Sequence, residues 1–277
     1  MQRFEDISGL PDDKIDLLLG ATLIAKDVYP ALDHLTLAAK LDDLARPLLG
    51  AGLEKLAAAD QAARLGQYLY VDLGFRGNQD DYYDPRNSLL PDVIERRVGI
   101  PITLALVYIE IARRARVDAT GVCFPGHFLV RIERNADAGE APGALLIDPF
   151  HAGRLLGEDD LVRMLKRVPG ENELRPEHTA PASPRAILVR MLVNLKAVHF
   201  SRGDYARAHL VLDRIVSLTP DSVMALKARA TLAAKLGAVE SARADLARVL
   251  ELEPYADDVQ ATKDALARLK KAHNGLN

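Results

Sequence analysis

The chain has 277 residues, with 36 Lys and Arg residues against 39 Asp and Glu residues, which gives a formal net charge of −3. This length suggests about two domains, and a hydrophobic content of 49% supplies a core for each, so the chain is not disordered as a whole. The balanced charge offers no concentrated basic surface, which excludes a typical nucleic-acid partner. Aromatic residues make up only 5% and Trp is absent, which favours packing of helix on helix.

The cysteine content bears on the cellular compartment. A single cysteine, Cys123, cannot form an internal disulfide, and no cluster of Cys and His has zinc-finger spacing. The chain opens with Glu5 and Asp6 where an export signal needs basic residues before an apolar core. The longest apolar stretch, 100–112, is too short to span a bilayer and contains Glu110. We therefore expect a cytoplasmic protein without a membrane segment.

The first hundred residues have mainly helical spacing. Residues 12 to about 70 carry apolar stripes at intervals of three and four, which predict helices. Residues 74–88 are polar and rich in turn-forming residues, and they predict a long loop. A short helix is expected at 91–97. Pro101 then begins a second helix that runs to about Arg116, with one strongly apolar face that we expect in the core.

The pattern changes to strands after this helix. Segments 119–124, 126–133 and 144–148 are rich in β-branched and apolar residues, and they predict a small antiparallel sheet. Asn, Asp, Gly and Pro in 135–143 predict a hairpin loop. Four prolines among polar residues in 167–184 indicate a boundary between two domains.

The C-terminal part of the chain repeats itself. Three positions recur at an offset of 34 residues (237 less 203): Gly203 and Gly237, Ala208 and Ala242, Pro220 and Pro254. This period is typical of tetratricopeptide repeats, in which Gly turns the chain, Ala lets two helices approach, and Pro ends the second helix. We expect these helical hairpins to bind a protein or peptide partner, and the sequence leaves the oligomeric state open.

One set of residues follows the order of a catalytic triad. Papain-like and transglutaminase-like enzymes place a nucleophile at a helix start, then a His, then an Asp, as Pro101, His127 and Asp148 lie here. The surrounding segments are more specific: 82–88, 95–104, 124–131 and 147–150. Together they resemble the bacterial SirB-type family, which joins a transglutaminase-like domain to C-terminal tetratricopeptide repeats, over nearly the whole chain. The resemblance implies that His127 and Asp148 occupy the His and Asp positions of the triad.

The expected fold is α+β and mostly helical. Residues 1–167 should hold N-terminal helices and a transglutaminase-like (papain-like) core, in which one helix packs on a small antiparallel sheet. Residues 168–184 should form a linker. Residues 185–277 should form tetratricopeptide-type helical hairpins.

The nucleophile departs from the family pattern. The expected Cys near 101–103 is missing, and Thr103 offers the only hydroxyl there, on a β-branched side chain that needs strong activation. Cys123 is the other candidate. Residues four apart on one strand lie about 13 Å apart, so its thiol reaches His127 only if the chain bends at Pro125 and Gly126. Otherwise Cys123 is a buried, inert thiol.

The remaining polar residues have both structural and functional interpretations. His127 and Asp148 form either a working pair or a retained structural hydrogen bond. Arg76, Asn87 and Arg131 either line the same cleft, where they would bind an anionic or amide group, or cap turns and pair with nearby carboxylates.

A metal site is the weakest of these interpretations. His151 is either a second imidazole near the site or a surface loop residue. His127, His151 and Asp148 have ligand types that suit zinc, but their spacing matches no known signature. We expect no metal and no other cofactor.

Two functions follow from these residues. The first is a cytoplasmic protein-interaction or scaffold protein on a degenerate transglutaminase-like fold that lacks the usual nucleophilic Cys. The alternative is an amide hydrolase or acyl transferase with His127 as base, Asp148 as orienting residue, and Thr103 or Cys123 as nucleophile. We do not expect a standard transglutaminase or protease. A nucleophile within hydrogen-bond reach of the His, with backbone N–H groups nearby for an oxyanion, would favour the enzyme.

Overall fold

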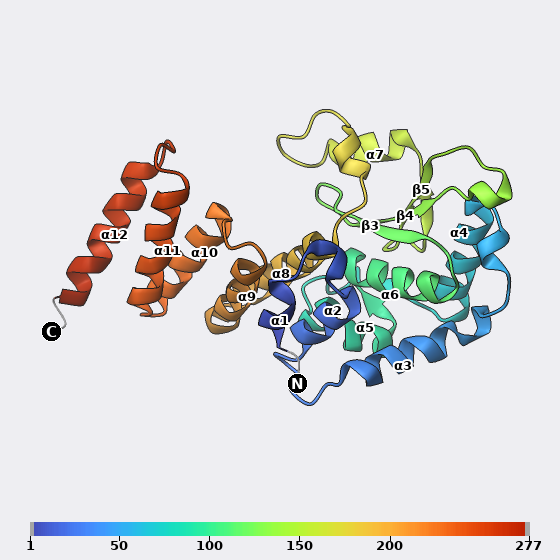
Figure 1. Cartoon of the computed structure of the whole chain (residues 1–277), viewed down its shortest axis with the longest axis horizontal. Coiled ribbons are helices and arrows are strands. Elements are labelled where there is room, and N and C mark those ends of the chain that lie inside the picture. Colours follow the sequence, from blue (N-terminus) through green and yellow to red (C-terminus); the bar gives the residue numbers. More distant parts are fainter. Residues whose placement is uncertain (1–2, 275–277) are drawn as a thin grey trace. The chain divides into compact units, whose positions relative to one another are not determined.

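Two compact units make up the chain in the computed structural model, which describes residues 3–274 and the side chains up to residue 269 (Figure 1). The larger unit is Leu10–Met191, and the smaller one combines Met1–Gly9 with Leu192–Asn277. Helix α8 (Pro184–Ser201) therefore contributes residues to both units. The domain limits given above at 167 and 185 stay a prediction.

The larger unit begins with capped helices, as the apolar stripes predict. Helix α2 (Leu17–Ala25) starts where the carboxylate of Asp16 accepts a backbone N–H from the first turn at 3.0 Å. Helix α3 (His34–Ala45) starts in the same way at Asp33, also at 3.0 Å. Each cap satisfies one of the N–H groups that a helix start leaves without a partner. Helix α4 (Ala58–Gly66) follows and continues into a π-helical turn.

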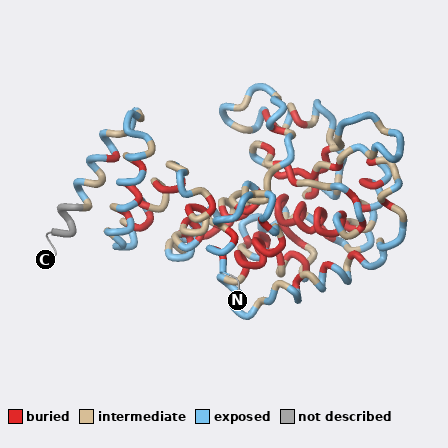
Figure 2. The backbone as a smooth tube through the Cα atoms, viewed as in Figure 1, coloured by how far each residue is buried: buried red, intermediate tan, exposed pale blue. Residues whose placement is uncertain are grey.

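The central element of this unit is helix α6 (Pro101–Arg114), which is buried from its first residue to Ala112 (Figure 2). Its predicted apolar face is confirmed, although the helix ends at Arg114 instead of Arg116. Helix α6 contacts α3, α5 (Leu90–Arg96) and two strands of the sheet. The burial of so many apolar side chains means that α6 contributes strongly to the hydrophobic stabilisation of this unit.

The predicted antiparallel sheet is present, with strands β3 (Ala119–Val122), β4 (Leu129–Glu133), β5 (Ala144–Asp148) and β6 (Arg154–Leu156) in sequence order. Its hairpin loop lies between β4 and β5, as expected. Strand β3 ends at Val122 instead of the predicted Phe124. Two further details were wrong. Strand β4 begins at residue 129 instead of 126, because a turn precedes it, and the short β6 was missed.

Helix α7 (Glu158–Leu165) follows β6 and covers one face of the sheet. Its residues Leu161 and Leu165 pack with Val122, Phe124 and others in one buried cluster. A second pairing, also missed, joins the two-residue strands β1 (Arg76–Gly77) and β2 (Val98–Gly99) in parallel. These strands are too short to leave a hydrophobic alternation in the sequence.

Short helical turns connect these elements in the larger unit. One is π-helical, Gln67–Asp72. The others are 3₁₀ turns: Asp12–Lys14, Arg46–Leu48, Leu53–Lys55, Pro85–Ser88, Ala136–Ala138 and Pro176–Thr179.

The smaller unit contains the predicted helical hairpins. After α8 it comprises α9 (Tyr205–Leu218), α10 (Val223–Lys235), α11 (Val239–Leu252) and α12 (Val259–Asn274). The short α1 (Phe4–Ser8) packs on α9, where Glu5 pairs with Arg214 at 2.9 Å.

The repeated residues have the roles that the period predicts. Gly203 and Gly237 have φ of 71° and 80°, a left-handed conformation that Gly adopts without strain. Ala208 and Ala242 are fully buried between helices. Arg229 of α10 adds an ionic link, because it binds carboxylates of both α9 and α11 at 2.6–3.0 Å.

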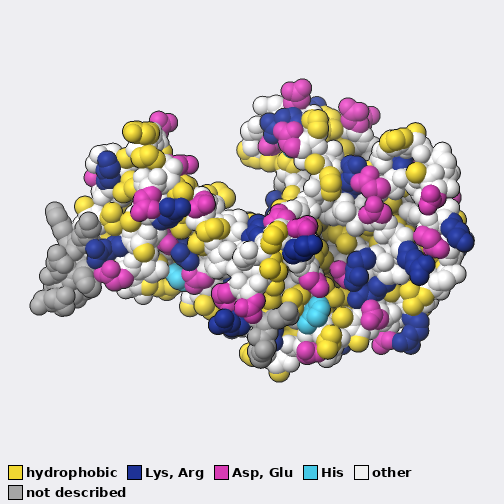
Figure 3. Space-filling view, viewed as in Figure 1, with side chains coloured by type: hydrophobic (Ala, Val, Ile, Leu, Met, Phe, Trp, Pro, Cys, Tyr) yellow, Lys and Arg dark blue, Asp and Glu magenta, His cyan; other side chains and the backbone are white. Residues whose placement is uncertain are grey.

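The fold class is therefore confirmed as a mostly helical α+β chain with a small antiparallel sheet and C-terminal helical repeats. Positive and negative side chains are interspersed on the visible face, without a field of one sign (Figure 3). Within the part of the chain that the structure describes, none of the helices has the length and apolar character needed to cross a membrane.

Candidate functional site

A tight turn between β3 and β4 positions His127. Gly126 has φ of 69°, and the backbone N–H of His127 donates to the carbonyl of Phe124 at 3.0 Å. Arg190 of α8 closes the turn by donating to the carbonyl of His127 at 3.3 Å. The imidazole is mostly buried, with 16% of the side chain exposed. A Gly that allows a left-handed conformation is thus the local reason why the His side chain is held at this edge of the sheet.

Asp148 lies at the end of β5 and is almost fully buried. Its Oδ1 accepts from Nε2 of His127 at 3.0 Å and its Oδ2 from Nδ1 of His151 at 2.7 Å. Backbone N–H groups of Phe150 and His151 also donate to Oδ1, at 3.0 and 3.3 Å. Burial raises the pKa of Asp148, but the hydrogen bonds and charges of His127 and His151 outweigh burial and lower that pKa to about 2. The carboxylate is therefore ionised at neutral pH.

The structure brings together the His and Asp that the triad order predicts. Because an ionised carboxylate only accepts, Nε2 of His127 carries the proton in this contact. Its Nδ1 then remains available to accept a proton from another group. In a catalytic triad this geometry holds the imidazole in the tautomer that a general base needs.

His151 completes a group of three side chains that could be tested as a metal site. The ligand atoms of His127, Asp148 and His151 lie within 4.8 Å of one another. A tetrahedral zinc ion at about 2.0 Å from each ligand would hold those atoms about 3.3 Å apart. The two imidazoles instead stack at 28° with centroids 6.2 Å apart, and each nitrogen points at its own carboxylate oxygen. This arrangement suits one carboxylate shared by two N–H donors better than one shared metal ion.

Thr103, one of the two nucleophile candidates, is fully buried at the start of α6. Its hydroxyl donates to the carbonyl of Asn87 at 2.7 Å and accepts from the backbone N–H of Ile100 at 3.2 Å. Pro101 in the first turn has no N–H to offer. The hydroxyl at the usual nucleophile position is therefore engaged by backbone groups, and the N–H of Ile100, a donor that could have faced an oxyanion there, is engaged by that hydroxyl.

Cys123, the other candidate, directly follows β3 and is half-buried. Burial raises the pKa of its thiol, and the positive charge of Arg190 opposes this only in part. Among the described residues, no hydrogen bond joins the thiol to His127. A raised pKa leaves less of the nucleophilic thiolate at neutral pH.

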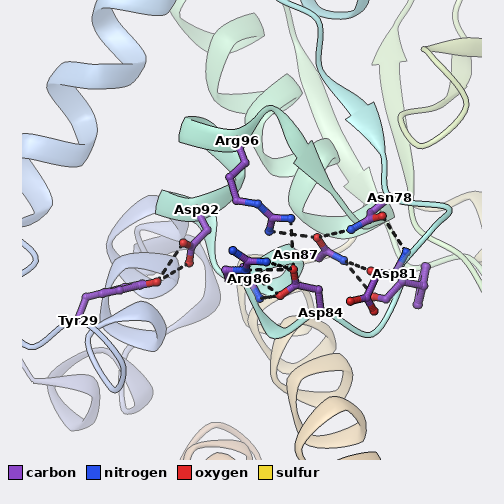
Figure 4. A network of polar contacts seen from close by, with 9 residues as sticks. Tyr29, Asn78, Asp81, Asp84, Arg86, Asn87, Asp92 and Arg96 are labelled. Carbon is purple, nitrogen blue, oxygen red and sulfur yellow. Dashed lines mark hydrogen bonds and ion pairs between the residues drawn. The ribbon is translucent and has the colours of Figure 1, made fainter.

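The three residues proposed for the cleft lie in different surroundings. Asn87 is fully buried and fastens the loop before α5, where its amide donates to the carbonyl of Asp81 at 2.7 Å (Figure 4). Arg131 binds Glu133 at 2.5 Å and the carbonyl of Thr179 at 3.3 Å. Arg76 is exposed in β1. None of the three lines the pocket beside His127 in the described part of the chain.

That pocket, of about 270 Å³, is instead lined by residues from β6 and α7 that sequence reasoning missed. Its lining residues are His127, Asp148, His151, Arg154, Leu156, Asp160, Arg163, Met164 and Arg167. The sequence did contain an indication of this lining, because Arg154, Arg163 and Arg167 follow Asp148 closely in the chain. Without β6, however, nothing indicated that this segment folds back beside the imidazoles.

Aromatic side chains adjoin the same His. Phe150 makes edge contacts with His127, His151 and Tyr82, with centroids 5.2–6.5 Å apart. Tyr82 also contacts Tyr83, and both are exposed. The segment 82–88, which carried part of the family resemblance, thus adjoins the site through Tyr82, which contacts Phe150.

Comparison with known proteins agrees with this architecture. A family model described as the transglutaminase-like superfamily matches residues 33–193, and one described as a tetratricopeptide repeat matches residues 195–267. No solved structure gives a significant match to the chain.

Named relatives occur in bacteria and in mammals. A UPF0162 protein of Xylella fastidiosa (strain 9a5c) is 37% identical over 275 residues, which cover 96% of this chain and 94% of that protein. A UPF0162 protein of Pseudomonas aeruginosa is 35% identical over 237 residues, or 85% of this chain and 84% of that protein. The F-box only protein 21 of Homo sapiens is 32% identical over 174 residues, which cover 61% of this chain but 27% of that protein.

Proposed function

The chain belongs to the bacterial UPF0162 proteins of the transglutaminase-like superfamily, and from this we propose that it is a protein-interaction or scaffold protein on a degenerate transglutaminase-like domain. The observation that carries the proposal is the hydrogen bonding of the Thr103 hydroxyl at the start of α6. The hydroxyl of Thr103 is buried and bonded to the carbonyl of Asn87 and the N–H of Ile100. A hydroxyl with these partners has no free path to a substrate carbonyl.

The thiol gives independent support. The pKa of Cys123 is raised by burial, whereas an active thiol needs a pKa lowered by a neighbouring imidazolium or a helix start. On this proposal, His127 and Asp148 are retained as a hydrogen-bonded pair that joins the turn before β4 to the end of β5. The single cysteine fits a reducing compartment, and we propose a cytoplasmic location.

The repeat unit supplies the interaction part of the proposal. Tetratricopeptide arrays present an extended helical surface, and such surfaces generally bind peptides or partner helices. Large apolar side chains are exposed on this unit, among them Met224 at 78% and Tyr255 at 95%.

One observation favours the alternative, an amide hydrolase or acyl transferase. His127 and Asp148 keep the geometry of a general base and its orienting residue at 3.0 Å. The enzyme would need the thiol of Cys123 to reach Nδ1 of His127 during turnover. Thr103 could serve only if α6 were to lose its first turn, because its hydroxyl bonds to the backbone there.

The two functions differ in what the variant His127→Ala does to a partner. We expect purified full-length chain on a support to enrich partner proteins from the native cell extract, with equal yield for wild type and His127→Ala. Met224→Ser together with Tyr255→Ser should lower that yield about tenfold, which corresponds to a loss of about 1.4 kcal/mol of binding free energy. Leu35→Ser, an exposed apolar residue of the larger unit at 74%, is the matched control.

A partner protein that wild type retains and His127→Ala does not, and that is chemically altered after contact with the chain, would contradict the scaffold function. In that case mass spectrometry of the retained protein would detect loss or exchange of an amide group. Equal yields for wild type and for the Met224 and Tyr255 variant would contradict binding by the repeat unit.

A further inference from the structure

The pocket beside the two imidazoles carries more positive than negative side chains. Three arginines line it, Arg154, Arg163 and Arg167, against the two carboxylates of Asp148 and Asp160. The pocket therefore has a surplus of one positive charge before either imidazole is protonated. Its volume of about 270 Å³ leaves room for a small ligand group.

Asp160 organises this side of the pocket. Its Oδ2 accepts the backbone N–H of Gly157 at 3.1 Å and so caps α7. Its Oδ1 accepts from Arg154 and also from Arg163, the latter at 2.5 Å. A guanidinium group has five N–H donors, so one shared oxygen leaves most donors of both arginines without a protein partner. The carboxylate thus holds two guanidinium groups at the pocket while using little of their hydrogen-bonding capacity.

Arg167 adds donors that the protein does not use. Within the residues that the structure describes, its guanidinium makes no hydrogen bond and no ion pair. It lines the pocket two residues past the end of α7. Free guanidinium donors at a pocket are the usual means of binding phosphate and carboxylate groups.

Asp148 at the pocket is an ionised carboxylate whose oxygens are already engaged by N–H donors. Asp148 receives two imidazole and two backbone N–H donors, and its charge is spread over those contacts. The outer nitrogen of His151 faces away from Asp148, on a side chain that is 54% exposed. Because Nδ1 of the ring carries the proton donated to Asp148, the outer nitrogen of a neutral His151 has a lone pair and offers no donor to an anion.

We propose that this pocket binds a small dianionic oxyanion group, namely a phosphate monoester, through the guanidinium groups of Arg163 and Arg167. A tetrahedral dianion accepts hydrogen bonds from several directions, which suits the two guanidinium groups that line the pocket from the end of α7 and just past it. A carboxylate has one charge and one plane, and it would leave at least one guanidinium unused. The proposal goes beyond the scaffold role and does not depend on the repeat unit.

Titration of the full-length chain with inorganic phosphate tests the proposal. Isothermal calorimetry and ³¹P line broadening would be measured at pH 7, with sodium chloride keeping the ionic strength constant. We expect saturable binding that weakens about tenfold in Arg163→Gln and again in Arg167→Gln, because a charge-assisted hydrogen bond to phosphate contributes about that factor. Arg46→Gln removes an exposed arginine of the same unit outside the pocket and should leave binding unchanged.

Three outcomes would overturn the proposal. Equal weakening in all three variants would mean general attraction of anions to a positive surface. Acetate that binds as tightly as phosphate would contradict a site for a dianion. Zinc chloride that binds at one equivalent and is lost in His151→Ala, without any phosphate binding, would assign the pocket to a metal instead. Loss of partner retention by the repeat unit, by contrast, would leave the phosphate result unaffected.

Discussion

Replacing Asp148 with Asn is expected to lower the free energy of unfolding of the larger unit by about 2–3 kcal/mol at pH 7. The carboxylate is buried and accepts from two imidazoles and two backbone N–H groups. An amide of the same shape keeps one acceptor oxygen but turns the other position into a donor. One imidazole N–H then faces an N–H group inside the protein. Urea unfolding followed by circular dichroism would measure the difference.

The pH dependence of that difference follows from the pKa of Asp148, which is lowered to about 2. A carboxylate whose pKa is lower in the folded state contributes stability above the unfolded pKa of about 3.9 and loses it as the pH falls toward 2. The gap between wild type and Asp148→Asn should therefore be constant above about pH 5 and narrow below it. Asp137→Asn, an exposed loop carboxylate, is the control for the charge change. Equal stability of wild type and Asp148→Asn at pH 7 would contradict the structural role given to this carboxylate.

Replacing Thr103 with Val should cost about 1–3 kcal/mol. Val keeps the volume and the β-branching but removes the hydroxyl that bonds to Asn87 and Ile100. The buried N–H of Ile100 and the carbonyl of Asn87 would then lack this partner. Thermal unfolding of the full-length chain would record a lower midpoint for the transition of the larger unit.

Thr103→Ser is the matched control, because it restores the hydroxyl without the methyl group. It should recover most of the lost stability, since the deleted methyl costs less than the hydrogen bonds. If Val were tolerated as well as Ser, the hydroxyl would not be holding the α6 start, and Thr103 would again be free to act as a nucleophile.

The sequence predicts the long elements of this fold well. Helix α6 has a continuous apolar face, and the repeat helices have paired Gly and Pro at a fixed period, so both are evident without coordinates. The short elements are missed. Strands β1, β2 and β6 contain two or three residues each, which is less than one period of the alternation that identifies a strand.

The same limit explains what was missed at the site. The pairing of His127 with Asp148 follows from the triad order and is present at 3.0 Å. The surroundings of Arg163 and Arg167 depend on β6, which returns the chain beside β5 and places α7 against the sheet. Contacts of this kind arise from tertiary packing, so the spacing of residues along the chain carries no record of them.

The turn between Cys123 and His127 decides how the two side chains are placed. Strand spacing separates residues four apart by about 13 Å, so the thiol could reach His127 only through a bend at Pro125 and Gly126. Gly126 does adopt a left-handed conformation, and strand β4 starts only at Leu129. The turn nevertheless directs His127 toward Asp148, and burial raises the pKa of the Cys123 thiol.

The central claim, that the domain keeps the His and Asp without a competent nucleophile, is tested most directly by the pH dependence of Cys123 alkylation. Iodoacetamide labelling of the native chain, followed by intact mass, would be compared between wild type and His127→Ala, with the denatured chain as reference. We expect slow labelling with an apparent pKa above the ordinary value of about 8.5, unchanged in His127→Ala. Rapid labelling with an apparent pKa well below that value, abolished in His127→Ala, would establish a thiolate paired with an imidazolium and contradict the account.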